Sequence, residues 1–181
     1  YYLKKGIVKT DKLHVRSFKF YADGALGSRG ALLRAPYSDR PESYGLPVMS
    51  LDAIEAAANR IANSEFQMNT HAIGDSANHQ VLLTYKKALN GKTDRRWRIE
   101  HAQVVSPEDF KYFDDIIPSI QPTHCTSDMY WAGDRVGSER LKGAYAYKEL
   151  LNVNGKVALG TDFPVEQVSP LLTFYAAVSR Q

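Results

Sequence analysis

Several classes of protein are excluded by what this 181-residue sequence lacks. It contains one cysteine, Cys125, so no disulfide can form within the chain. A single thiol is typical of a reducing compartment, and we expect a cytoplasmic protein. No run approaches the ~20 apolar residues of a membrane helix, so we expect no membrane partner. Neither a secretory signal nor an Asn-x-Ser/Thr glycosylation site is present.

The sequence also lacks a strong excess of charge of one sign. Its net charge is +3, with 44% hydrophobic and 24% charged residues, which is typical of globular proteins. The densest basic run is 95–98 (Arg-Arg-Trp-Arg). It could contact nucleic acid, but a solvated loop leading into a strand is the better interpretation. We therefore expect a small-molecule substrate and no nucleic acid.

The chain begins at Tyr1 rather than at a methionine, and we expect it to be part of a longer protein. Its length suffices for one domain with a sizeable core, so residues 1–181 are predicted to form a single domain.

Strand-like and helix-like segments alternate along the chain, which predicts a parallel α/β fold. Helix starts are signalled by Ser50, by 106–109 (Ser-Pro-Glu-Asp) and by Ser169 followed by proline, and Gly91 is a helix stop. The predicted strands are 14–21, 66–72, 97–103, 116–121 and 156–161, and the predicted helices are 51–63, 76–90, 138–151 and 171–179.

Five strand–helix units fit a (β/α)8 barrel that lacks its first three units. A doubly wound open sheet is the rival arrangement, but its Gly-rich nucleotide turn is absent. Two long connections, 26–47 and 123–137, follow predicted strands. Long loops in compact domains are usually functional or disordered, and barrel active sites lie at the carboxyl ends of the strands.

Unusual polar residues occur where four of these strands end. His71, His101 and Asp162 each end a predicted strand, and Lys19 lies near the end of the first. In a barrel, residues at successive strand ends come together although they are far apart in sequence. Two imidazoles and a carboxylate suit Zn²⁺ or a similar divalent ion, which generates a hydroxide nucleophile at neutral pH. Asp162 could then carry the proton to the leaving group.

Each of these residues also has an ordinary structural interpretation. A lone histidine at a strand end is often only hydrogen-bonded, Asp162 could cap a turn, and Lys19 could lie on the surface. An inward lysine is instead desolvated and favours the neutral amine, which can add CO₂ to give a metal-bridging carbamate. The combination of all four favours a metal site.

The connection 123–137 is rich in aromatic and charged residues, which favours a functional loop. We predict that it contacts the substrate through His124, Trp131, Asp134 and Arg135.

At these residues the chain resembles the YtcJ-like branch of the amidohydrolase superfamily, a branch that includes N-substituted formamide deformylase. The resemblance covers almost the whole chain. It is carried by the segments 18–29 (FKFYADGALGSR), 70–75 (THAIGD), 98–103 (RIEHAQ) and 159–164 (LGTDFP).

The resemblance implies a (β/α)8 barrel, of which this chain holds strands four to eight, and a small β-rich companion domain. It implies that Lys19, His71, His101 and Asp162 bind one or two divalent metal ions, zinc above all. Lys19 is carbamylated in some members. The implied reaction is hydrolysis of a carbon–nitrogen bond by metal-activated water, with Asp162 as metal ligand and proton carrier.

The chain departs from the family in one respect, because no His-x-His pair is present among its five histidines. The first three strand–helix units and the β-rich domain are also missing. Two alternatives therefore stay open: a binding fragment without metal or catalysis, and a metal-dependent enzyme for another reaction, such as phosphoester hydrolysis. Unpaired sheet edges would further invite self-association.

Overall fold

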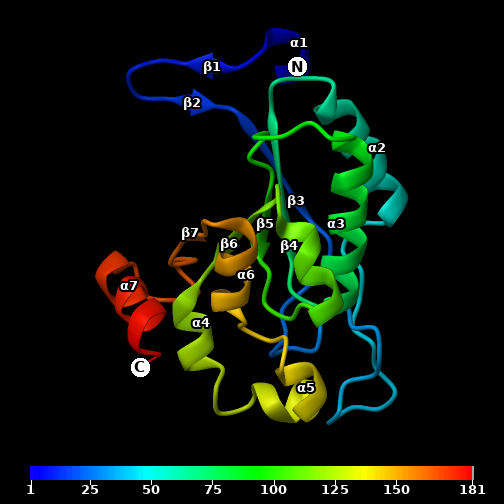
Figure 1. The fold of residues 1–181 in the computed structure, drawn as a ribbon, viewed down its shortest axis with the longest axis vertical. Coiled ribbons are helices and arrows are strands. Elements are labelled where there is room, and N and C mark those ends of the chain that lie inside the picture. The colour runs from blue at the N-terminus through cyan, green and yellow to red at the C-terminus, as the bar shows by residue number, and fades with distance from the viewer. Residues whose placement is uncertain (181) are drawn as a thin grey trace.

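A parallel sheet of five strands organises the molecule, as the computed structural model of residues 1–180 shows (Figure 1). Every neighbouring pair of strands in it is parallel. The strands follow one another in the order β3 (Ser17–Tyr21), β4 (Gln67–Ala72), β5 (Arg98–His101), β6 (Ile117–Ile120) and β7 (Ala158–Leu159).

The strand order decides between the two predicted architectures. A doubly wound sheet reverses its strand order at a switch point, whereas barrel strands follow one another in sequence order. The sheet here has no reversal from β3 to β7. The predicted fold class, an α/β protein with part of a (β/α)8 barrel, is confirmed.

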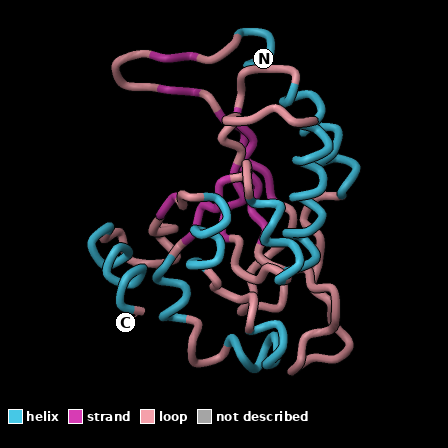
Figure 2. The backbone as a smooth tube through the Cα atoms, viewed as in Figure 1, coloured by secondary structure: helices cyan, strands magenta, loops and turns pink. Residues whose placement is uncertain are grey.

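The five strands of the sheet gather at the centre of the chain trace, with helices and long loops around them, whereas two short strands near the N-terminus lie apart (Figure 2). No helix within residues 1–180 combines the length and the apolar character needed to cross a bilayer. The helical segments that connect or follow the strands are α2 (Leu51–Ala62), α3 (Asp75–Leu89), the 3₁₀ segment η1 (Pro107–Phe113), α4 (Pro122–Ser127), α5 (Ala132–Leu141), α6 (Tyr147–Asn154) and α7 (Pro170–Ser179).

A small hairpin precedes the sheet. A short helix, α1 (Tyr2–Lys5), leads into β1 (Val8–Lys9) and β2 (His14–Val15), which pair antiparallel and project away from the sheet (Figure 1). The predicted strand 14–21 is therefore split between β2 and β3.

Two predicted helix starts are confirmed by capping hydrogen bonds. The Ser50 hydroxyl accepts from the Ala53 amide at 3.3 Å and begins α2. The Ser169 hydroxyl accepts from the Leu172 amide at 3.3 Å and begins α7. Each bond satisfies one of the amides that a helix start leaves without an internal partner.

Two other local predictions are wrong. The single helix predicted over 138–151 is two helices, α5 and α6, separated by 142–146. Gly137 has a non-helical φ of 74° inside α5, and the helix resumes at Ser138, where the sequence predicts a helix start. The connection 123–137 is largely helical. The helix start predicted at 106–109 is present, and it begins the 3₁₀ segment η1.

The main core lies between the sheet and the helices. Tyr85 of α3 and Trp97 before β5 are fully buried, with ring centroids 4.7 Å apart in an edge-to-face arrangement. Their polar atoms are satisfied, because Tyr85 Oη lies 2.6 Å from Thr70 Oγ1 and Trp97 Nε1 donates to the Phe66 carbonyl at 3.3 Å. Buried aromatic residues with hydrogen-bonded polar atoms strongly stabilise such a core.

A second apolar cluster lies under the loop that follows β3. Leu26, Leu33 and Tyr37 from this loop pack with Ile73 after β4 and Val136 of α5. The loop is thereby held against the segments that follow the strands, and this positions the residues described next.

Candidate metal and substrate site

Residues from the carboxyl ends of the strands surround a cavity of about 440 Å³. Lys19, His71, His101 and Asp162, the four residues predicted to meet, all line it. They come from β3, β4, β5 and the segment just after β7. The structure thus places all four at one end of the sheet.

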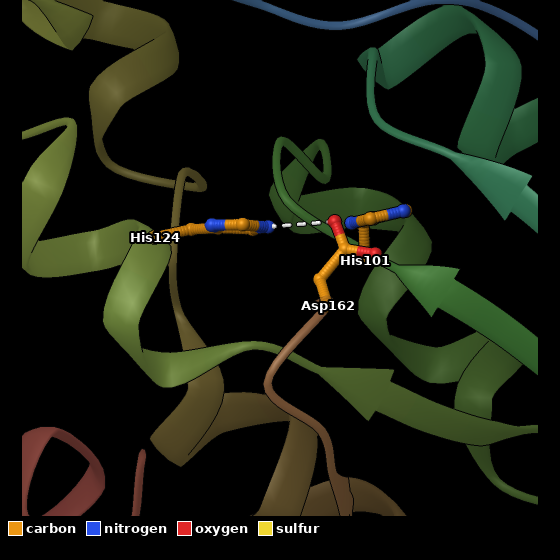
Figure 3. A group of neighbouring side chains, drawn as sticks. All are labelled: His101, His124 and Asp162. Atoms are coloured by element: carbon orange, nitrogen blue, oxygen red, sulfur yellow. Dashed lines mark hydrogen bonds and ion pairs between the residues drawn. The ribbon is translucent and has the colours of Figure 1, made fainter. Parts of the chain in front are cut away.

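Three residues form the tightest group of possible metal ligands. One donor atom each from His101, His124 and Asp162 lies within 4.8 Å of the others (Figure 3). The two imidazole rings are nearly parallel, at 15° with centroids 5.9 Å apart, and His124 Nε2 lies 3.3 Å from Asp162 Oδ2. Two nitrogens and one carboxylate oxygen form a typical donor set for Zn²⁺ and similar ions.

This group contains two of the four predicted metal ligands, His101 and Asp162, together with His124. His124 was predicted to contact the substrate, but the structure puts it in the group of three, where His71 was expected. His71 is adjacent, with its ring centroid 4.5 Å from that of His101.

An unusual backbone conformation lets His101 reach the cavity. In the sheet register Glu100 pairs with His71, whereas His101 pairs with Ala72. Strict alternation along β5 would therefore put His101 on the face opposite to His71. His101 has a φ of 76° and Ala102 a φ of 45°, so the extended backbone ends at His101. Left-handed φ values in residues other than glycine cost energy and are concentrated at functional sites.

The environment of His101 suits metal binding. Burial, followed by the nearby His71, His124 and Lys19, lowers the pKa of His101 to about 2. The ring is therefore neutral at physiological pH, which is the form that binds a metal ion. Its Nδ1 is buried and has no hydrogen-bond partner within residues 1–180. A buried nitrogen without a partner is costly, and a metal ion would satisfy it.

A carboxylate and a hydroxyl fix the orientation of His124. Its Nδ1 lies 3.1 Å from Glu166 Oε1, and the Ser127 hydroxyl donates to the same oxygen at 2.7 Å. Histidine ligands commonly donate their second ring N–H to a carboxylate, which fixes the ring.

A buried carboxylate lies beside His71. His71 Nε2 is 3.4 Å from Asp23 Oδ1, and the Asp23 side chain is fully buried. The Asp23 carboxylate also accepts from the amides of Leu32, Ile73 and Gly74 at 2.9, 3.0 and 2.8 Å. One carboxylate therefore joins the loop after β3 to the end of β4 and orients His71.

Lys19 lies on β3, at an edge of the sheet, where its side chain is exposed to solvent. Partial burial nevertheless lowers its pKa, against the opposing charges of Glu100 and Asp162. The direction favours the neutral amine, as predicted for an inward-facing lysine.

The predicted substrate-contact residues of α5 and the preceding segment occupy different positions. Trp131 lines the cavity. Asp134 is exposed and does not line the cavity. Arg135 does not line it either, because its guanidinium is paired with Asp39 and bonded to the Gly27 carbonyl. It stacks over the Trp131 ring, 5.6 Å from the centroid, so it supports the cavity wall from outside.

Several residues of the site were not predicted. Gln103, Asp128 and Glu166 line the cavity. Gln103 and Asp128 lie in segments that the sequence marks as functional, but neither was chosen as a site residue. Glu166 follows Asp162 by four residues, and this acidic spacing after the last strand is the one signal that could have indicated it.

Comparison with known proteins agrees with this geometry. The profile of a family described as "Amidohydrolase family" matches residues 3–181. "Protein LONG AFTER FAR-RED 3" of Arabidopsis thaliana is 40% identical over 183 residues, covering 98% of this chain and 31% of the relative. "Putative amidohydrolase YtcJ" of Bacillus subtilis (strain 168) is 37% identical over 169 residues, covering 91% of this chain and 31% of the relative. The chain thus spans about a third of the length of these relatives.

Solved structures give the same result. An uncharacterized metal-dependent hydrolase from Pyrococcus horikoshii OT3 matches 98% of this chain with a TM-score of 0.88 and 33% identity. One from Pyrococcus furiosus matches 99% with a TM-score of 0.88 and 34% identity. This chain covers 37% and 38% of those two proteins.

Proposed function

This chain belongs to the amidohydrolase family, and from that premise we propose that it acts within a metal-dependent hydrolase of carbon–nitrogen bonds other than peptide bonds. The observation that carries the proposal is the group formed by His101, His124 and Asp162 at the cavity. Its donors fit a divalent ion, and we propose zinc.

Within this proposal the cavity residues have distinct roles. His101, His124 and Asp162 would hold the ion, and His71 and Lys19, which line the same cavity, would complete the site or bind a second ion. A bound ion would polarise the substrate carbonyl and lower the pKa of a water molecule. With the ion bound, the Asp162 carboxylate would accept a proton from water and return it to the leaving nitrogen.

We further propose that residues 1–181 are one domain that supplies strands four to eight of a barrel. The remaining strands and a β-rich domain would come from elsewhere in a longer cytoplasmic protein that acts on a small molecule. The length of the relatives supports this, because the chain spans 31% of each curated one. The strands β3 and β7 are the edges of the sheet, where either barrel closure or self-association would satisfy the free backbone groups.

Metal analysis of the purified chain tests the metal site. We expect zinc to bind in stoichiometric amounts, and His101→Ala or His124→Ala to abolish this binding. His14→Ala is the matched control, because His14 is exposed and does not line the cavity. Zinc binding that survives both site substitutions, or no zinc binding at all, would contradict the proposed site.

The bond specificity needs a separate test on the longer protein. We expect hydrolysis of members of an amide panel and none of a phosphotriester panel under the same conditions. Turnover of phosphotriesters alone would replace the proposed reaction by phosphoester hydrolysis on the same site.

A further inference from the structure

We propose that Asp128 forms a subsite of the cavity for a positively charged nitrogen group, such as a guanidinium or an ammonium. The inference rests on the proposed function in taking this cavity as the substrate site. Asp128 lines the cavity but is not one of the three residues of the metal-ligand group.

The Asp128 carboxylate is held in one orientation. Its Oδ2 accepts from the Tyr145 hydroxyl at 2.7 Å and from Gln103 Nε2 at 3.0 Å. Gln103 Nε2 also donates to Tyr145 Oη at 2.8 Å, so the three polar groups form a closed triangle. Gln103 and Tyr145 are both buried, which fixes the triangle against the protein interior. A side chain immobilised in this way is preorganised for binding.

The second carboxylate oxygen has no comparable partner. Oδ1 of Asp128 lies 3.4 Å from the Ser127 hydroxyl, but that hydroxyl has one proton and donates it to Glu166 Oε1 at 2.7 Å. Oδ1 is therefore available to a donor that enters the cavity.

No basic side chain neutralises Asp128 in residues 1–180. None of the ion pairs found there includes it, and the neighbouring arginines are bonded elsewhere: Arg135 to Asp39, and Arg180 to the Tyr145 carbonyl at 3.0 Å. Burial raises the pKa of Asp128, while hydrogen bonding from Tyr145 and the nearby His124 oppose this. A partly buried carboxylate without a counter-ion is unfavourable, and a cationic ligand group would remove that penalty.

An aromatic side chain gives the cavity a rigid wall. Trp131 lines the same cavity and lies three residues after Asp128. Its ring is fixed from two sides, because a Cβ at Gly27 would lie 3.2 Å from it and Arg135 stacks over it. Trp131 therefore supplies a rigid apolar wall against which the alkyl part of a cationic ligand can pack.

Two small probes of similar shape test the subsite without any catalysis. N-butylguanidinium is charged at all working pH values, whereas N-butylurea is neutral and has similar N–H donors. We expect calorimetry on the chain, with the metal removed by a chelator, to show roughly tenfold tighter binding of the guanidinium, equivalent to about 1.4 kcal/mol. Asp128→Asn should abolish this preference and leave the urea affinity within about twofold.

A matched control and a second variant separate recognition from folding. Asp134→Asn removes an exposed acid from the neighbouring helix and should keep the tenfold preference. Tyr145→Phe removes one donor to Oδ2 but keeps the Asp128 charge, so it should reduce the preference only in part.

Equal affinities of the wild-type chain for the two probes would overturn the proposal, as would saturable binding of neither. So would a preference that persists in Asp128→Asn. Because these measurements use metal-free protein, their outcome is independent of the proposed hydrolysis. A chain that discriminates between the probes but binds no zinc would keep the subsite and lose the proposed function.

Discussion

His124 lies between two carboxylates, with Nδ1 3.1 Å from Glu166 Oε1 and Nε2 3.3 Å from Asp162 Oδ2. If Nδ1 donates its proton to Glu166, Nε2 keeps its lone pair toward the cavity, which is the tautomer that binds a metal ion. Ser127 fixes the Glu166 carboxylate in turn. In the proposed metal site, Glu166 is therefore a positioning residue that acts through His124.

Removal of this carboxylate should weaken metal binding. We expect Glu166→Ala to lower the zinc affinity roughly 10–100-fold, because the His124 ring loses its orienting acceptor. Glu166→Gln keeps an acceptor oxygen and should recover part of the loss. Competition with a chromophoric chelator measures both. Glu149→Ala, at an exposed site on α6, should bind zinc as tightly as the wild type, and an equally tight Glu166→Ala variant would refute the positioning role.

The buried imidazole of His101 should make the metal-free chain sensitive to acid. Its pKa is about 2 in the folded chain and about 6.5 when unfolded, so between these values the unfolded state binds a proton that the folded state does not. Above pH 6.5 the ring is neutral in both states and does not affect stability. Below pH 6.5 the unfolded state is favoured by protonation, so the free energy of unfolding falls. The loss approaches about 1.4 kcal/mol per pH unit well below 6.5.

Urea unfolding at pH 7 and pH 5 in the presence of a chelator measures this effect. From pH 7 to pH 5 the free energy of unfolding should fall less in His101→Gln than in the wild type, because the titrating ring is gone. His14→Gln changes an exposed ring and should behave as the wild type does. An identical pH dependence in His101→Gln and the wild type would show that another group is responsible.

The sequence predicts most of the secondary structure and the parallel sheet, because these depend on local signals. Serine caps locate the starts of α2 and α7, and the alternation of strands and helices gives the parallel sheet. Residues that end successive strands were correctly expected at one cavity, since parallel strands bring their carboxyl ends to one edge.

The details of the site depend on tertiary structure and were missed for that reason. His101 is brought to the cavity by a backbone turn in which its φ is 76°. The conformational preferences of histidine do not predict this value. His124 joins the metal-ligand group because α4 begins directly after β6, in a segment that was predicted to be a loop. Asp128 is oriented by Gln103 and Tyr145, which are 25 and 17 residues away in sequence, and such pairings have no local signal.

The Asp23 carboxylate should be one of the main determinants of stability. It is buried and accepts three backbone N–H groups, and hydrogen bonds to charged groups contribute more than neutral ones. Asp23→Asn places an amide donor against at least one of these N–H groups. We expect the free energy of unfolding to fall by about 2–4 kcal/mol, measured by urea denaturation. Asp11→Asn, at an exposed position, should change it by less than about 0.5 kcal/mol.

A tight steric constraint lies at Gly74, at the start of α3. A Cβ at Gly74 would lie 2.0 Å from the Leu32 carbonyl oxygen. The φ of Gly74 is −75°, so the backbone itself would accept alanine, and the restriction is steric. The same carbonyl accepts from the amides of Ser76 and Ala77 at 3.2 and 3.3 Å, and so takes the place of a capping side chain for α3.

Gly74→Ala should therefore both displace Leu32 and disrupt this cap of α3. We expect a loss of about 2–4 kcal/mol in the free energy of unfolding, from overpacking and from the broken cap. Gly133→Ala is the matched control. Its added Cβ meets nothing closer than 3.9 Å, and alanine favours the helix, so stability should be unchanged or slightly raised. If Gly74→Ala were as stable as Gly133→Ala, the loop after β3 would not lie as close to α3 as the structure shows. The orientation of His71 by Asp23 would then lose its structural basis.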